Sequence, residues 1–126
     1  MVTKISSVGL SGMSAFPVKV EISASRGIPT MIIGGLADKS VQESIMRIKA
    51  AVTNNGMKMG QFRCDINLSP SNIKKSGSGY DLAILIAVLA VTGYVPEALD
   101  GKAFIGEVSL GGEVCPIQGA LAMAIE

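Results

Sequence analysis

The segment Leu82–Val91, LAILIAVLAV, most constrains what this chain can fold into, because it has no polar side chain on any face. The uncharged run that contains it extends only to Pro96, which is too short for a bilayer span. The segment is therefore predicted to form a helix that Asp81 can cap and that ends at Thr92-Gly93. A helix without a polar face must be covered all round, so we expect it at the centre of the domain.

Strand patterns lie on both sides of a second, amphipathic helix. FPVKVEIS (16–23) alternates apolar and polar residues, and TMIIGG (30–35) follows after a turn, so we expect a hairpin. Ser40 and Glu43 have the spacing of a capping box, and Asn54-Asn55-Gly56 can end the helix. Between these signals runs an apolar stripe, with a solvated face expected for the charged residues, Arg47 included; the stripe is Val41, Ile45, Ile48 and Val52.

The second half adds a strand and a hairpin. RCDINL (63–68) alternates like a strand, and AFIGEVSL (103–110) and EVCPI (113–117) flank Gly111-Gly112, which predicts a two-residue hairpin turn. A helical pattern, QGALAMAIE (118–126), then begins without a stop signal. We expect an α/β (α+β) fold with a mixed sheet, two main helices and a truncated third helix, in one domain (1–126) excised from a longer protein.

Composition excludes several kinds of chemistry. The chain has no histidine, which removes Ser-His-Asp catalysis, Cys-His catalysis and HExxH zinc sites. Carboxylates are not clustered at metal-ligand spacing, so no metal site is expected. Cys64 and Cys115 are expected to be reduced core residues. The net charge of +1 gives no overall field for nucleic acid or membrane, and the N-terminus has no signal-peptide pattern, so we expect a cytoplasmic protein.

The loop KKSGSGYD (74–81) can be interpreted in three ways: as a phosphate cradle, as the holder of a nucleophilic serine, or as a tight turn into the buried helix. A P-loop places its lysine after the glycines, whereas Lys74 and Lys75 come before Gly77 and Gly79. Asp81 would also occupy the position that an anion prefers at a helix N-terminus. We therefore expect no bound nucleotide here, and we interpret Gly77, Gly79 and Asp81 as a structural loop.

The order of these segments resembles the proteolytic domain of Lon, whose PKDGPSAG loop carries a catalytic serine activated by a lysine from a later segment. Lys75, Gly77 and the run GEVSLGGEVCPIQG (106–119) match that pattern. Gly79-Tyr80-Asp81 replaces Ser-Ala-Gly, and no lysine follows Lys102, whereas Ser-Lys catalysis needs an amine beside the hydroxyl. A Ser-Lys peptidase built on Ser76 or Ser78 is therefore only an alternative, and we expect no catalytic residue in this chain.

The chain is more similar to the N-terminal Lon-like domain of the ComM family, the magnesium-chelatase-related AAA+ ATPases. The similarity covers nearly the whole chain and is carried, in order, by VKVEIS, GIPTMIIGGLADKSVQESIMRIKAAV, INLSPSNIKKSGSGYDLAI and FIGEVSLGGEVCPIQGAL. Lys74 and Ser76 stand where that family usually has a proline and an acidic residue, which makes this loop more basic.

That resemblance implies an accessory, non-catalytic domain of a hexameric, ATP-driven DNA motor that acts in branch migration and recombination. ATP and Mg²⁺ would belong to an AAA+ module of the same chain, and the partners would be that module, other copies of the chain and DNA. Lys74 and Lys75 would be the nucleic-acid contacts, since lysines on phosphate give a salt-dependent affinity. A stand-alone ligand-binding domain is a further alternative.

Overall fold

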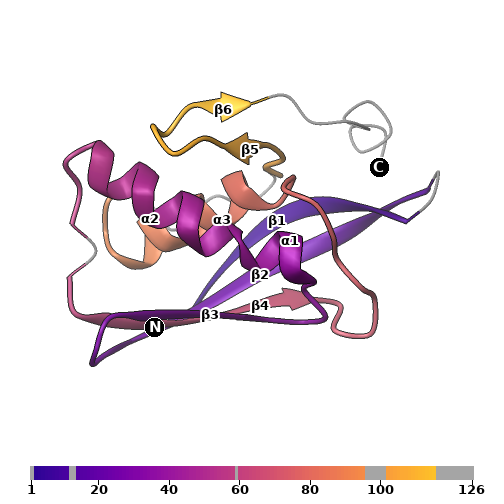
Figure 1. Ribbon diagram of the computed structural model, residues 1–126. Helices are drawn as coiled ribbons and strands as arrows, with labels where there is room; N and C mark the ends of the chain where they lie inside the picture. Colours follow the sequence, from indigo (N-terminus) through magenta and orange to yellow (C-terminus); the bar gives the residue numbers. More distant parts are fainter. Residues whose placement is uncertain (1, 12–13, 59, 96–101, 116–126) are drawn as a thin grey trace.

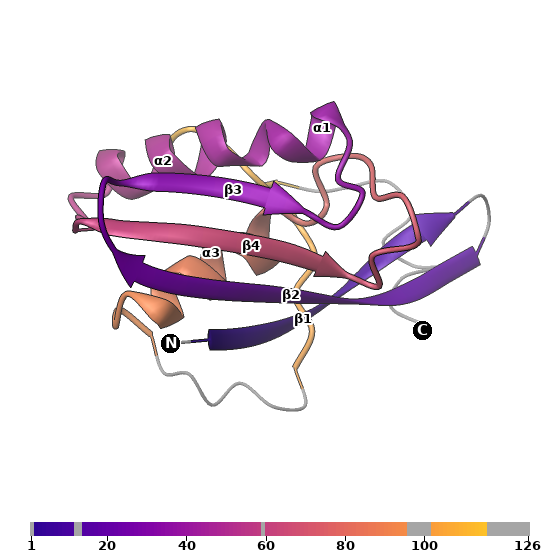
Figure 2. The same cartoon turned by 90° about the horizontal axis from the view of Figure 1, so that it is seen from below.

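The computed structural model describes residues 2–11, 14–58, 60–95 and 102–115, and these form three layers (Figure 1). A four-stranded sheet forms the first layer, three helices cover one of its faces, and a short hairpin lies on the other side of the helices. The opposite face of the sheet is open, as Figure 2 shows from below. The expected α/β class with a mixed sheet is confirmed, whereas the more specific Lon-like fold remains a prediction.

The sheet has the strand order β1-β2-β4-β3. β1 pairs with β2 and β2 with β4 in antiparallel fashion, and β4 pairs with β3 in parallel fashion. Alternate residues point to the helices, so that Val20, Ile22 and Ile66 are buried while their sequence neighbours face outward. The strands are β1 (Val2–Ser11), β2 (Ser14–Arg26), β3 (Thr30–Gly34) and β4 (Phe62–Ser69).

The expected hairpin between β2 and β3 is wrong, because β4 lies between these two strands. β3 runs parallel to β4, and two parallel neighbours need a crossover connection rather than a tight turn. The helices α1 (Lys39–Gln42) and α2 (Ser44–Asn54) supply that crossover and cover the sheet. The true hairpin partner of β2 is β1, a strand that we did not predict.

The N-cap of the crossover helix lies two residues before the expected capping box. Asp38 is the N-cap of α1, where its Oδ1 accepts hydrogen bonds from the Val41 amide (3.1 Å) and the Ser40 hydroxyl (2.5 Å). The Ser40–Glu43 capping box is therefore wrong. The apolar stripe is confirmed at three of its four positions, since Val41, Ile48 and Val52 are buried and Ile45 is half-buried.

The helix α3 (Asp81–Val91) occupies the predicted central position. It packs on β1 and β2 on one side and contacts α2 and the β5 strand on others. Most of its residues are buried, while Leu82, Leu85 and Ile86 are half-buried. Burying a branched aliphatic side chain contributes about 1.5–3 kcal/mol, so this helix is a main source of stability.

The hairpin of β5 (Glu107–Val108) and β6 (Val114–Cys115) lies on the helices rather than in the sheet. Its turn is longer than the predicted two residues, because Ser109 N donates to Glu113 O (2.8 Å) and encloses three residues. Two side chains at the end of α2 hold this turn: Asn54 donates to Leu110 O (2.9 Å) and Asn55 to Gly111 O (3.0 Å).

Both cysteines are free thiols. Cys64 is buried in β4, as predicted, and its burial raises the pKa of the thiol. Cys115 is half-exposed at the hairpin, so its expected place in the core is wrong. The helical pattern predicted for 118–126 lies outside the described residues.

Candidate functional site

The loop of residues 70–80 connects the end of β4 to α3 and carries the residues that the sequence singled out. Lys74, Ser76 and Gly77 are exposed, and Ser78 and Gly79 are half-buried. Lys75 and Tyr80 are fully covered by the rest of the domain. The loop thus has an outer side with one cation and an inner side that packs against the core.

Lys75 does not lie on the surface, so the expectation of two solvent-facing cations is wrong for this residue. Its side chain is 0% exposed, and Nζ donates to the backbone carbonyls of Gly35 (2.8 Å) and Pro70. Burial lowers the pKa of Lys75 because the protonated amine loses its water. Lys74, by contrast, remains exposed beside Asp38, whose carboxylate has a lowered pKa chiefly through its Ser40 hydrogen bond and in smaller part through Lys74.

Asp81 lies in the first turn of α3 but does not cap it, since Tyr80 is the N-cap and makes no side-chain cap bond. The Asp81 carboxylate is 0% exposed and points toward α2 and β5 instead. It forms a two-pronged ion pair with Arg47, through Nε (2.6 Å) and Nη2 (2.9 Å). It also accepts from the Ser44 hydroxyl (2.5 Å) and the Val108 amide (3.1 Å).

This arrangement joins three elements through one carboxylate. α2 contributes Ser44 and Arg47, α3 contributes Asp81, and β5 contributes the Val108 amide. The hydrogen bond to Asp81 raises the pKa of Arg47, which is permanently charged in any case. Arg47 was expected on a solvated face, and that expectation is wrong because the guanidinium turns inward to the carboxylate.

The serines of the loop have no lysine partner among the described contacts. The Ser78 hydroxyl donates to the carboxylate of Glu107, at the start of β5. The amine of Lys75 donates to two backbone carbonyls, those of Gly35 and Pro70, and not to either serine. Gly79, at the position that the Lon pattern gives to its serine, accepts a hydrogen bond from Gly106 N through its carbonyl (3.0 Å). The segment after Gly119 lies outside the described residues.

The loop does not fit a nucleotide phosphate. The Gly77 amide donates to the Ser40 hydroxyl (2.7 Å), and the Leu82 amide at the start of α3 donates to Gly106 O (3.0 Å). The Asp81 carboxylate adds a negative charge at the same helix end, where an anionic phosphate would be repelled. The residues of this loop are therefore unsuited to hold ATP or its Mg²⁺.

Of the two glycines predicted to shape the loop, one has a backbone that requires glycine. Gly77 has φ +86°, in the left-handed region that other residues avoid. Gly79 is not among the described glycines with positive φ, and its contribution is the carbonyl that binds Gly106.

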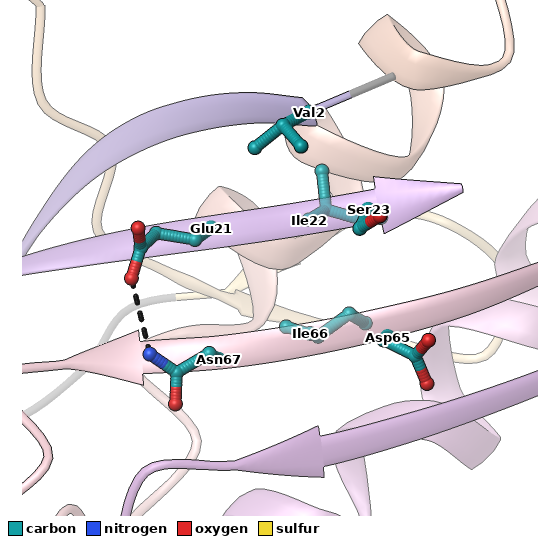
Figure 3. Close-up of a pocket in the computed structure, with 7 residues that line it drawn as sticks. All are labelled: Val2, Glu21, Ile22, Ser23, Asp65, Ile66 and Asn67. Carbon is teal, nitrogen blue, oxygen red and sulfur yellow. Dashed lines mark hydrogen bonds between the residues drawn. The ribbon is translucent and has the colours of Figure 1, made fainter. Parts of the chain in front are cut away.

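A shallow pocket of about 260 Å³ lies on the open face of the sheet, away from the loop (Figure 3). Its amide and carboxylate side chains already have partners, since Asn67 donates to Glu21 (3.0 Å) and Asp65 pairs with Arg63 at 3.4 Å. Across the described residues there is no group of three or more His, Cys, Asp or Glu side chains that could hold a metal ion. In the same part of the chain, no helix has the length and apolar character needed to cross a membrane.

Comparison with known proteins decides the family. The sequence profile described as subunit ChlI of Mg-chelatase matches residues 20–126. The chain belongs to this ChlI family. The predicted relationship to the magnesium-chelatase-related proteins is thereby confirmed.

Relatives of this ChlI family member include the competence protein ComM of Haemophilus influenzae, with 31% identity over 87% of this chain. The uncharacterized protein YifB of Escherichia coli is 34% identical, and an uncharacterized protein of Mycobacterium tuberculosis is 39% identical, each over 91% of this chain. The predicted resemblance to ComM is thus confirmed. The chain spans only 22% to 23% of the length of these relatives.

Sequence reasoning missed the most connected residues of this ChlI family member. Arg47 was assigned to a solvated helix face and Glu107 to a strand, without any link to Asp81 or Ser78, and Ser44 was given no role. One local signal could have indicated a buried polar contact: Ser44, a small polar residue, lies on the same helix face as the apolar residues Val41 and Ile48.

Proposed function

We propose that this chain is a non-catalytic accessory domain of a ComM-like AAA+ ATPase that drives DNA branch migration in recombination. Membership of the ChlI family and the similarity to a competence protein support this role. ATP and Mg²⁺ would then be bound by an AAA+ module elsewhere in a longer protein, and the working assembly would be a cytoplasmic hexamer on DNA.

The observation that carries the non-catalytic part is the state of the polar groups around the 70–80 loop. Glycine occupies the nucleophile position at residue 79. The Ser78 hydroxyl donates to the carboxylate of Glu107, and the Asp81 carboxylate accepts from Arg47 and from the Val108 amide. A Lon-type Ser-Lys site needs a lysine amine within about 3.2 Å of the serine hydroxyl, whereas the Lys75 amine is hydrogen-bonded to two backbone carbonyls and the Ser78 hydroxyl to the Glu107 carboxylate.

Lys74 is the candidate contact between this domain and DNA. It is the exposed cation of the loop, whereas Lys75 is buried in the described conformation. With a net charge of +1 the single chain has little attraction for DNA, and several copies in a ring would gather their Lys74 side chains. We therefore propose that DNA contact depends on the assembly.

The test uses the protein encoded by the complete reading frame. We expect a Walker A motif outside these 126 residues, together with DNA-dependent ATP hydrolysis and branch migration of a four-way junction. Deleting the domain should abolish branch migration while leaving basal ATP hydrolysis measurable. Loss of casein cleavage on Ser78→Ala would instead favour the peptidase, and a reading frame that lacks an ATPase module would refute the proposal.

A further inference from the structure

Lys75 places a positive charge in the interior without a counterion. Its side chain is 0% exposed, and its two hydrogen-bond acceptors, Gly35 O and Pro70 O, are neutral carbonyls. Among the described residues, no carboxylate oxygen lies within 4 Å of its Nζ, since the ion pairs of this part of the chain involve other residues. A buried charge that lacks an ionic partner is costly to keep away from water.

Apart from the carbonyl of Pro70, which belongs to the loop itself, the contacts that keep Lys75 inside come from one short segment. Lys75 N donates to Leu36 O (2.9 Å), and Asp38 N donates to Lys75 O (3.0 Å). Further along the loop, Gly77 N donates to the Ser40 hydroxyl (2.7 Å). These partners belong to residues 35–40, which form the turn after β3 and the start of α1, and none lies within the strands of the sheet.

That turn is itself strained. Leu36 has φ +57°, in the left-handed region that a side chain with a Cβ disfavours, and its side chain is 55% exposed. Because the Leu36 side chain is largely exposed, burial of its apolar surface does little to offset the backbone strain. The closed position of the loop therefore combines a desolvated ammonium group with a strained backbone at its attachment point.

The two ends of the loop are held separately from this attachment. Leu68, near the end of β4, is 0% exposed in the core. At the other end, Asp81 is fixed by Arg47, Ser44 and Val108. Residues 78–80 of the loop are also held, by the Ser78–Glu107 and Gly106–Gly79 hydrogen bonds and by the burial of Tyr80. The central part of the loop, residues 71–77, can therefore leave the Gly35–Leu36 turn while both ends, the sheet and α3 keep their native contacts, as expected for local opening.

We propose that Lys75 is a concealed cation, and that local opening of the 70–80 loop away from the Gly35–Leu36 turn brings its ammonium group to the surface beside Lys74. The open loop presents two adjacent amines, an arrangement that fits a phosphate-rich polyanion. This inference concerns a motion of the chain itself and goes beyond the proposed function.

The test is amine labelling with an acetylating reagent at increasing urea concentrations below the unfolding transition, read residue by residue by mass spectrometry. Lys74 serves as the exposed amine on the same loop. Cys64, 0% exposed in β4, reports global unfolding through a parallel thiol reaction, and Cys115 is the accessible thiol. We expect Lys75 to react at least about tenfold more slowly than Lys74, at a rate that changes little with urea, because local opening exposes little surface.

Two results would overturn the proposal. If Lys75 reacted as fast as Lys74, it would not be concealed. If its protection fell with urea in parallel with that of Cys64, only global unfolding would release it. A Leu36→Asn variant adds a directional check, because asparagine tolerates the left-handed region. Relieving the strain of the closed turn should slow Lys75 labelling about threefold or more, and faster labelling would contradict the role of the turn.

Discussion

At the scale of single residues, Asp81 is the side chain on which most of the site depends. Its carboxylate receives hydrogen bonds from α2 and β5 while belonging to α3, and it is wholly shielded from water. The two-pronged pairing with Arg47 directs the guanidinium inward and fixes the spacing of α2 and α3. Removing one partner of such a pair is strongly destabilising, because the other partner is left as an uncompensated charge inside the protein.

We predict that Asp81→Asn destabilises the domain by about 3 kcal/mol, because the partly buried Arg47 charge, 17% exposed, loses its partner and the new amide presents a donor to other donors. The matched control is Asp65→Asn. Asp65 pairs with Arg63 at 3.4 Å with both side chains about half exposed, so that change should cost no more than about 1 kcal/mol. Urea unfolding followed by circular dichroism gives both values, and equal effects would contradict the central role of Asp81.

We predict that the burial of Lys75 makes the stability of the domain rise with pH in the alkaline range. Its pKa is lowered in the folded state by desolvation, so above this lowered value the unfolded chain binds more protons than the folded one. Stability due to Lys75 therefore rises with pH until the unfolded value of about 10.4 is reached. Compared with Lys75→Met, the native chain should become relatively more stable over that range. A constant difference across this pH range would rule the effect out.

At the scale of elements, the turn after β3 decides where the crossover begins. Gly35 has φ +90°, and a Cβ at this position would lie 2.2 Å from Leu68 O, in the neighbouring strand β4. The backbone of β4 thus occupies the space that a side chain would need. Only glycine fits at position 35, and the turn leads the chain from β3 into α1.

We predict that Gly35→Ala destabilises the domain more than Gly56→Ala does. Both glycines have positive φ, so each substitution incurs about 1–2 kcal/mol of backbone strain. Gly56 has no atom within 4 Å of the added Cβ, whereas Gly35 has a backbone carbonyl, which should add about 1–3 kcal/mol. Parallel urea titrations measure the difference, and similar midpoints for the two variants would show that β4 yields to the added methyl group.

The same elements show how far the sequence could predict this structure. The β4 strand and the apolar side of α2 follow from periodicity, and the α3 helix follows from an unbroken apolar run with a stop signal after it; all three are confirmed. The β2–β3 hairpin is wrong because insertion of β4 between them depends on pairing across many residues, which a local pattern does not encode. The inward turn of Arg47 and the burial of Lys75 also depend on distant partners, Asp81 and Gly35.

At the scale of the whole molecule, the surface charge is nearly balanced and the helices cover only one face of the sheet (Figure 2). The outer face carries paired charges, such as Lys4 with Glu21 at 3.9 Å and Arg63 with Asp65. Neighbouring charges of opposite sign cancel at a distance beyond about 8–10 Å in physiological salt. Under the proposed function, a long-range attraction for DNA would therefore have to arise from several copies acting together.

We predict that the 126-residue chain alone binds duplex DNA weakly or not at all, while Lys74→Ala in the assembled full-length protein lowers DNA affinity. Each phosphate contact contributes about 0.9 to the slope of log affinity against log salt, so the slope should flatten by about that amount for each lost contact. ATP binding should be unchanged. Lys58→Ala, an exposed lysine between α2 and β4, is the control. An unchanged slope for Lys74→Ala would make this lysine an ordinary solvated charge.

The contact between Gln42 and β3 has a consequence for how the chain behaves at high concentration. β3 lies at the edge of the sheet and contains no charged residue, which is the type of strand that can template the addition of another chain. Gln42 Nε2 donates to Ile33 O (2.8 Å), so one backbone acceptor of this edge is already occupied by a side chain from the crossover helix. A single amide thus makes the edge less available for aggregation.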